Sequence, residues 1–367
     1  MKIALIQDSL LVCAGSERVF KCMIEEFPEA DIFTLAYNKE TTCPFFLKYT
    51  INTSWINKII QSHKTFKFFF PISTFVMQFW NFHKYDIIIS SSATTAKYIS
   101  RFSGKHFCFG YFPTRAIWDY DRYFPKLSFS KLFFKLLLPY LKSRDLNAKK
   151  RVTTFISQSQ VSMLAFKKYY NINAPIIHSP MDYHKFKNGL NEEKSDYYLI
   201  VSRLEQWKKI EFAIEAFNEM KKLKLKIIGG GPLMGRFKKI ANPNIQLLGN
   251  LSDNELVRHY GKAKALIFTP ELEYGLTPLE SLAAGTPVIA YGKGAVLETM
   301  IPFKDNNIFS TAIFFEKQNS THLLEGISKF ETLNFDREKI SNYAEKFGEE
   351  NFRKKLRSFI NINSKER

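Results

Sequence analysis

The sequence predicts an α/β protein made of two doubly wound domains, each built on a parallel sheet. Short apolar runs alternate with helical patterns in both halves of the chain, which is typical of βαβ units. The 367 residues exceed what one hydrophobic core normally organises. A polar stretch, NGLNEEKSD at 188–196, separates the two runs of alternation, so we expect domains at 1–190 and 191–367.

In the first domain, the apolar run at 2–7 predicts a strand, and Ala14, Gly15 and Ser16 predict a turn before a helix at 17–27. Because ligands collect at the carboxyl ends of parallel strands, Gly15 is a candidate for close backbone approach to a phosphate. A plain tight connection is the alternative. The remaining expected elements are strands at 31–35, 85–90, 106–110 and 152–157 and helices at 93–102 and 131–142.

The second domain repeats this alternation. Arg203 and Lys208 stand between its first strand and first helix, where two cations and a helix N-terminus suit a diphosphate. Solvated surface charges are the alternative. The expected strands are 197–202, 225–228, 245–248, 265–268, 288–290 and 312–315. The expected helices are 208–221, 233–240, one capped by S-x-x-E at 252–255, 336–346 and 349–360.

The stretch TPELEYGLTPLESLAAGTPVIAY at 269–291 joins a strand end, a turn, a helix start and a second strand with few residues between them. Thr277 is the expected N-cap, Pro278 the first helical residue and Glu280 the end of a T-x-x-E capping box. A helix N-terminus after a strand offers backbone N–H groups that suit a phosphate. A carboxylate on that turn also accepts hydrogen bonds from a ribose, so Glu280 is either a cap or a ribose ligand.

These residues resemble the family-4 retaining glycosyltransferases of the GT-B fold. The resemblance lies in SRLEQWKK at 202–209, GGGP at 229–232, LGN at 248–250 and the 269–291 stretch. The opening IALIQDSLLVCAGSERVF and the run at 115–119 are similar to bacterial mannosyltransferases of O-antigen assembly. The resemblance implies two Rossmann-like domains that face each other across a cleft, with an acceptor-binding first domain and a donor-binding second one.

The resemblance also implies a role for individual residues. Arg203 and Lys208 bind the donor diphosphate and stabilise it as it leaves, and Glu280 holds the donor ribose. The other implied donor contacts are Gly15, Asn250, Gly275, Leu276 and Thr277. The candidate acceptor contacts are Arg115, Trp118 and Asp119. The last helix is expected to cross back to the first domain.

Two positions depart from the family pattern. The first glutamate of the family's E-x7-E pair falls on Leu272, so we expect Glu271 to reach the site instead. The first-domain histidine falls on Tyr111, whose hydroxyl can hydrogen-bond a sugar. Both family positions contact the donor sugar, so retuned transfer and lost turnover both stay open.

The implied chemistry is retaining transfer through an oxocarbenium-like transition state, with charge building on the diphosphate. Fixed cations and helix dipoles take the place of a metal in this scheme, and no D-x-D motif stands in a suggestive loop. We therefore expect no metal and no cofactor. The nucleotide-sugar is a substrate, and the best estimate for it is GDP-mannose.

The fold alone does not explain the net charge of +18 or the 36 phenylalanines. Codon bias is one explanation, and binding to an anionic membrane surface is the other. The segments 64–80 and 124–151 interleave bulky apolar residues with cations, as interfacial segments do. No window is apolar enough to span a bilayer, and no signal peptide precedes the first strand. The four cysteines show neither a disulfide framework nor zinc spacing, so a cytoplasmic protein at the inner membrane face is expected.

Three classes of function remain. The first is transfer of a sugar to a lipid-linked glycan in surface polysaccharide synthesis. The second is a GT-B protein without turnover that serves as a binding or scaffold partner. The third is a nucleic-acid or polyanion binder, which the charge alone favours; no nucleic-acid motif accompanies it, so no nucleic-acid partner is expected.

Overall fold

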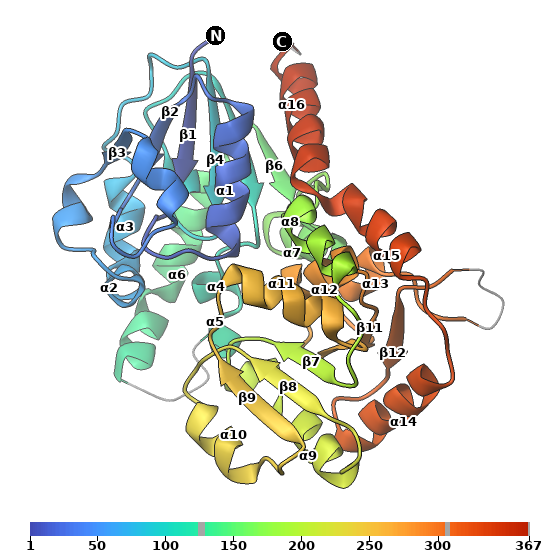
Figure 1. The fold of residues 1–367 in the computed structure, drawn as a ribbon. Coiled ribbons are helices and arrows are strands. Elements are labelled where there is room, and N and C mark those ends of the chain that lie inside the picture. Colours follow the sequence, from blue (N-terminus) through green and yellow to red (C-terminus); the bar gives the residue numbers. More distant parts are fainter. Residues whose placement is uncertain (124–128, 305–308, 366–367) are drawn as a thin grey trace. The chain divides into compact units, whose positions relative to one another are not determined.

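The computed structural model describes residues 1–123, 129–304 and 309–365 (Figure 1). The chain forms two compact units, Met1–Pro180 with Phe352–Arg367, and Met181–Asn351. We call them the N-terminal unit and the C-terminal unit. Each contains one parallel six-stranded sheet, which confirms the predicted α/β fold class with its two domains. The polar stretch 188–196 lies inside the C-terminal unit and not between the units.

The sheet of the N-terminal unit has the strand order β3-β2-β1-β4-β5-β6. Its strands are β1 Ile3–Gln7, β2 Asp31–Thr34, β3 Ile51–Thr53, β4 Ile87–Ser92, β5 Lys105–Gly110 and β6 Thr154–Ser157. Its helices are α1 Gly15–Glu26, α2 His63–Phe68, α3 Phe70–Val76, α4 Arg115–Trp118, α5 Tyr120–Tyr123, α6 Phe129–Lys149 and α7 Gln160–Tyr170, joined by the last helix, α16 Glu349–Lys365.

Both faces of this sheet are buried, which is why its strands are continuous apolar runs. Ile3 and Leu5 of β1 pack in a cluster with α1 and with Phe352, Leu356 and Ile360 of α16. The alternate residues of β1, at 4 and 6, pack in a second cluster on the other face with α2 and α3. The final helix therefore belongs to the core of the N-terminal unit.

The sheet of the C-terminal unit has the order β12-β11-β10-β7-β8-β9. Its strands are β7 Tyr198–Val201, β8 Leu225–Ile228, β9 Ile245–Gly249, β10 Leu266–Phe268, β11 Val288–Tyr291 and β12 Ala312–Phe315. Its helices are α8 Tyr183–Lys187, α9 Glu211–Glu219, α10 Met234–Ile240, α11 Asp253–Lys262, α12 Leu276–Ala283, α13 Val296–Thr299, α14 Ser320–Glu331 and α15 Arg337–Ala344.

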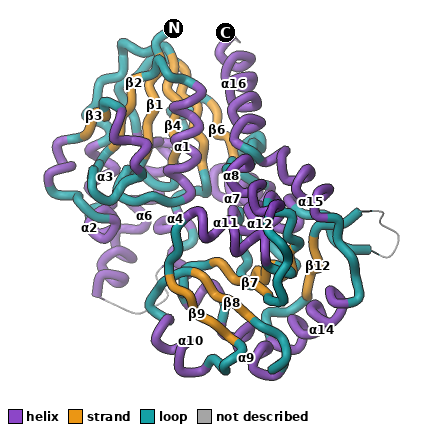
Figure 2. The backbone as a smooth tube through the Cα atoms, in the orientation of Figure 1, coloured by secondary structure: helices purple, strands orange, loops and turns teal. Residues whose placement is uncertain are grey.

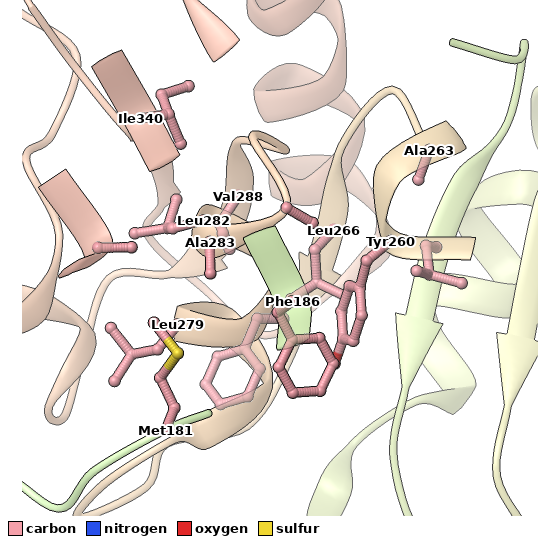
Figure 3. Packing of buried hydrophobic residues seen from close by; sticks show 14 of the residues in the cluster. Met181, Phe186, Tyr260, Ala263, Leu266, Leu279, Leu282, Ala283, Val288 and Ile340 are labelled. Atoms are coloured by element: carbon pink, nitrogen blue, oxygen red, sulfur yellow. The ribbon is translucent and has the colours of Figure 1, made fainter. Parts of the chain in front are cut away.

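Two layers of helices cover this second sheet, as Figure 2 shows in purple around the orange strands. On one face, α8, α11, α12 and α15 form a cluster in which Phe186 and Tyr260 pack edge to face near Leu279 (Figure 3). On the other face, α9, α10 and α14 pack against alternate strand residues such as Leu225 and Ile227. Ligands of such sheets bind at the carboxyl ends of the strands, so those ends are where a site is expected.

Two expectations about the N-terminal unit are wrong. The helix predicted at 93–102 is only a short 3-10 helix, Ala96–Tyr98, because the preceding backbone N–H groups bind the Asp8 carboxylate. Cys13 and Cys43 also form a disulfide, although the cysteine spacing indicated none. They lie after β1 and β2, which are parallel neighbours, so residues 30 positions apart meet at one edge of the sheet. Cys22 and Cys108 are buried and free.

Candidate functional site

A small cavity of 190 Å³ lies at the carboxyl ends of β7 and β10 in the C-terminal unit. Three of the predicted site residues line it: Arg203, Lys208 and Thr277. The remaining wall comes from the ends of the two strands and from Pro270. The cavity therefore lies at the switch region where a doubly wound sheet binds its ligand.

Lys208 is held by the loop that follows β7. It closes a 3-10 helix, Gln206–Lys208, and its carbonyl accepts a hydrogen bond of 2.7 Å from the hydroxyl of Thr269. The helix predicted from residue 208 begins instead at Glu211, because Lys209 adopts a left-handed φ of 53° that ends the 3-10 turn. The two loops that carry Lys208 and Thr269 are thus fixed to each other.

The charge of Lys208 is only partly balanced. Burial lowers the pKa of its ammonium to about 8, and Arg203 lowers that pKa too, whereas Glu205 and Glu273 raise it. Arg203 is exposed and pairs with Glu205 at 2.7 Å. A partly buried ammonium with a depressed pKa gains from an incoming anion, since the anion restores its preference for the charged form.

The glycine turn after β8 approaches the loop of Arg203 closely. Gly229 has a φ of 125°, and a Cβ there would lie 2.0 Å from the carbonyl oxygen of Ser202, so only glycine fits. Asn250 is exposed and lies against Gly230, where a Cβ would be 3.3 Å from its Oδ1. Asn250 follows β9 at the same edge of the sheet but does not line the small cavity.

The start of α12 differs from the predicted capping box. Gly275 is the N-cap, and no side chain caps this end of the helix. Leu276 and Thr277 are its first residues, so their N–H groups lack intrahelical acceptors. Glu280 is buried, and the Tyr260 hydroxyl donates a 2.9 Å hydrogen bond to its Oε2.

The glutamates before α12 have different environments. Glu271 is exposed, and it does not line the small cavity. Glu273 is buried at 8% exposure and lies near enough to Lys208 to raise its pKa. Leu272 turns its carbonyl to the Ala295 N–H at 3.0 Å. The sequence reasoning missed Glu273; its E-x6-E spacing with Glu280, one residue shorter than the family pair, was the available signal.

In the N-terminal unit, the carboxyl ends of the central strands are organised by Asp8. The Asp8 carboxylate follows β1 and accepts hydrogen bonds of 2.6 to 2.7 Å from the N–H groups of residues 93 to 96. The hydroxyl of Ser92 donates a further bond of 3.1 Å. One buried carboxylate therefore fixes the whole loop after β4.

Tyr111 contacts the start of α1 at this edge. Gly15 is the first residue of α1, and Glu17 in the same turn bonds back to the Ala14 N–H at 3.2 Å. The Tyr111 hydroxyl donates to the carbonyl of Ser16 at 3.3 Å and pairs with the Ser91 hydroxyl at 2.9 Å. Burial raises the pKa of Tyr111 well above its usual value. Tyr111 thus stays neutral and positions the start of α1.

The candidate acceptor residues lie on and after α4. Arg115 begins this helix and stacks on Phe112 at 4.7 Å, and Asp119 ends it. The Trp118 indole donates a 2.6 Å hydrogen bond to the fully buried Asp145, which also accepts from the hydroxyl of Tyr98 at 2.6 Å. Trp118 is therefore held rigidly by a buried polar network, while Asp119 is half-buried.

Comparison with known proteins finds relatives for the C-terminal unit. The family described as Glycosyl transferases group 1 matches residues 182–347, almost the whole C-terminal unit. The alpha-monoglucosyldiacylglycerol synthase of Streptococcus pneumoniae is 32% identical over 174 residues, which are 44% of this chain and 37% of that protein. The alpha-1,3/1,6-mannosyltransferase ALG2 of Eremothecium gossypii is 45% identical over 47 residues, 12% of this chain and 9% of that protein. The matches thus span well under half the length of these curated relatives.

The likeness to solved structures extends over both units. HepE of Anabaena, solved in complex with UDP, aligns with 99% of this chain and 100% of its own, with a TM-score of 0.69 and 13% identity. Together with the two parallel six-stranded sheets, this likeness shows the GT-B fold.

Proposed function

We propose that this chain is a retaining glycosyltransferase that moves a sugar from a nucleotide-sugar to a lipid-linked glycan of a surface polysaccharide, such as an O antigen or capsule. One observation carries the proposal: the cavity at the ends of β7 and β10 joins Lys208 and Arg203 to the uncapped start of α12. Cations and free helical N–H groups are the two devices that proteins use to bind a diphosphate. The family match over residues 182–347 supports the same activity.

In this proposal the C-terminal unit binds the donor. Lys208 and Arg203 contact the diphosphate, and the N–H groups of Leu276 and Thr277 bind its oxygens. Glu280, held by Tyr260, accepts hydrogen bonds from the ribose hydroxyls. Asn250, against the glycine turn, contacts the base.

We assign the sugar-facing carboxylate to Glu273, in preference to the earlier candidate Glu271. Glu273 is buried beside Lys208, whereas Glu271 points to solvent. A carboxylate beside the diphosphate cations orients the donor sugar through its hydroxyls and stabilises the positive charge that develops on the ring. Glu273→Gln should therefore lower kcat by more than Glu271→Gln, and equal losses would remove this assignment.

The leaving diphosphate is the charge that the site must stabilise. As the glycosidic bond breaks, negative charge grows on the diphosphate beside Lys208 and the start of α12. The acceptor hydroxyl attacks from the same face, and its proton passes to the leaving phosphate. These fixed charges supply the stabilisation, so the reaction proceeds without a metal; activity that depends on magnesium and is lost on chelation would contradict this.

We propose mannose from GDP-mannose as the donated sugar. The similarity to the ALG2 mannosyltransferase over 47 residues supports mannose, together with the resemblance of the opening residues to O-antigen mannosyltransferases. The pneumococcal relative is named as a glucosyl lipid synthase, so UDP-glucose is the competing donor. A panel of nucleotide-sugars in thermal-shift measurements decides between them, since the preferred ligand raises the melting temperature most.

The acceptor is proposed to be lipid-linked because the N-terminal unit has an apolar and basic surface. Helices α3 and α6 pack through Phe75 and Tyr140, whose ring centroids are 6.4 Å apart. Around them, Phe68 and Leu136 are each 76% exposed. No helix of the described residues is long and apolar enough to cross a membrane. This surface therefore suits peripheral binding to an anionic bilayer, with Arg115, Trp118 and Asp119 contacting the acceptor. Residues 124–128 of the interfacial segment lie outside the described part of the chain.

A second candidate is a GT-B protein that binds nucleotide-sugar without turnover. Two observations favour it: Leu272 at the family glutamate position and Tyr111 with its hydroxyl engaged by Ser91 and Ser16. Purified chain with the preferred nucleotide-sugar and a lipid-linked acceptor separates the two candidates. Retained anomeric configuration in a transfer product supports the enzyme, and saturable binding without transfer or donor hydrolysis supports the scaffold.

A further inference from the structure

A second cavity opens at the opposite edge of the sheet in the C-terminal unit. It has a volume of 720 Å³ and lies where β7, β8 and β9 begin. Tyr197, Leu225 and Asn244 mark the three strand starts in its wall. It shares no lining residue with the cavity around Lys208, which lies at the strand ends. The two cavities are therefore separate sites on one sheet.

Cations from three elements converge on this second cavity. The loop after α9, strand β8 and helix α11 contribute Lys221, Lys222, Lys224, Lys226, Arg258 and Lys262. Lys226 is held on the β8 face opposite Leu225 and Ile227, which pack in the core. The cations thus come from fixed elements as well as from a loop.

The acidic groups in the wall are engaged elsewhere. Asp196 pairs with Lys264 at 3.6 Å, outside the cavity wall, and Glu255 accepts the Ser252 N–H at 2.9 Å to cap α11. Arg258 and Lys262 share one carboxylate, Glu192, at 3.7 and 3.4 Å. In the described part of the chain, Lys221, Lys222, Lys224 and Lys226 form no ion pair. The cavity therefore carries a large uncompensated positive charge.

The cations around the cavity lower one another's pKa values. Burial lowers the pKa of Lys226, and the neighbouring Lys262 and Lys224 lower it further. His259, which also lines the cavity, has its pKa lowered by burial and then by Lys226. A solvated lysine surface spreads its charges apart, whereas here they are close enough to oppose each other's protonation. An anion in the cavity removes this repulsion.

We propose that this cavity binds a ligand with several phosphate charges, at a site independent of the nucleotide-sugar. Lysine ammonium groups bind phosphate as point charges from several directions, which matches an arrangement drawn from three elements. The volume exceeds that of a single phosphate, so the ligand carries either two or more phosphates or a phosphate on a larger group. A soluble oligophosphate and a phosphorylated lipid headgroup share this chemistry.

The test uses inorganic triphosphate as probe, titrated calorimetrically into the full chain at fixed ionic strength. We expect saturable binding of one triphosphate in the Lys208→Gln variant, which weakens the nucleotide-sugar site. Adding K224Q and K226Q should weaken this binding by about tenfold or more, because two of the converging charges are lost. Lys238→Gln with Lys239→Gln is the matched control, since both lysines lie on α10 outside the cavity.

Three results would overturn the proposal. The first is that triphosphate does not bind saturably to Lys208→Gln, and the second is that the control pair weakens triphosphate binding as much as K224Q/K226Q does. The third is that K224Q/K226Q has a lower melting temperature and that its partial unfolding accounts for the lost triphosphate binding. Nucleotide-sugar affinity should stay unchanged in K224Q/K226Q, so failure here leaves the proposed transferase activity intact. Cosedimentation with phosphatidylglycerol and phosphatidylcholine vesicles identifies the source. If K224Q/K226Q cosediments less with the anionic vesicles, the ligand is a lipid headgroup. If its cosedimentation is unchanged while its triphosphate binding is weaker, the ligand is soluble.

Discussion

The carboxyl edges of the two sheets are built from the same elements but are completed differently. In the N-terminal unit, the Asp8 carboxylate accepts hydrogen bonds from four backbone N–H groups, and the Tyr111 hydroxyl donates to the start of α1. The backbone of the loop after β4 is thus satisfied within the unit, whereas the buried side-chain oxygens of Gln7 and Thr94 have no partner among the described residues. In the C-terminal unit, α12 begins without a side-chain cap and Lys208 keeps an ammonium of depressed pKa. The first edge is closed in the sense that a side chain of the unit binds its loop N–H groups, and the second is open because the start of α12 is left for a ligand to complete.

Among the variants that test this comparison, removal of the Asp8 carboxylate should have the largest effect on stability. Asp8→Ala leaves four N–H groups of the β4 loop without their buried acceptor, so we expect unfolding free energy to fall by about 3 to 5 kcal/mol. Chemical denaturation of the chain measures it. The control is Asp119→Ala, at a half-buried carboxylate outside this network, and it should lower the free energy of unfolding by well under half as much. A similar loss of stability in both variants would mean that the closed edge does not depend on Asp8.

The disulfide is the second test of the closed edge. Cys13 and Cys43 tie the loops after β1 and β2 across 30 residues of sequence, which corresponds to about 3 to 4 kcal/mol of unfolded-state entropy. We expect the C13S/C43S double variant, and the wild type under reductant, to lose stability by that amount. Cys108→Ser, at a free cysteine, keeps the disulfide and should respond to reductant as the wild type does, whereas C13S/C43S should not respond. If reductant leaves the wild-type transition unmoved, the bond makes no contribution.

Lys208→Ala tests the open edge through ligand affinity, where the two previous variants test the closed edge through stability. We expect nucleotide-sugar affinity to weaken by about 1.5 to 3 kcal/mol, the contribution of a charge-assisted contact, while stability stays nearly constant. Isothermal titration with the preferred nucleotide-sugar and a melting curve measure both. Lys239→Ala on α10 is the matched control. Unchanged affinity in Lys208→Ala would reject the assignment of this cavity to the diphosphate.

The smallest expected effect is a pH dependence at the same residue. The pKa of Lys208 is lowered from 10.5 to about 8, so the free site loses the charge of Lys208 as pH rises through 8. A bound diphosphate raises that pKa again, so affinity should fall by up to about tenfold per pH unit above pH 8. Lys208→Arg keeps its charge throughout and should show no such decline between pH 8 and 9.5. An identical decline in both proteins would assign the titration to another group.

The sequence was informative where one physical cause dominates. Strands buried on both faces are continuous apolar runs, so β1, β8 and β11 could be located within a residue or two. The cations after β7 could be placed at the correct edge because parallel sheets fix which strand ends share an edge. Local patterns failed where distant residues compete for the same groups.

The failures share that cause. The T-x-x-E pattern predicted Thr277 as the cap, but α12 begins at Leu276 after Gly275, and the Glu280 carboxylate accepts a hydrogen bond from Tyr260 on a different helix. The helix predicted at 93–102 is shortened by Asp8, more than 80 residues earlier in the chain. Glu273 lies in the same turn as Glu271 and Leu272, and only the fold of that turn decides which carboxylate is buried. Cysteine spacing likewise carries no information about which loops two parallel strands bring together.

The contribution of α16 to the N-terminal unit bears on the order in which the chain acquires its structure. Phe352, Leu356 and Ile360 complete a core that begins with β1, whereas the C-terminal unit is one uninterrupted segment. During synthesis on the ribosome, the N-terminal unit therefore keeps an incomplete interior until residues 352–360 have been translated. The half that emerges second already has all its own residues by then, so a stop codon shortly before residue 352 should spare it and leave the earlier half vulnerable to proteases.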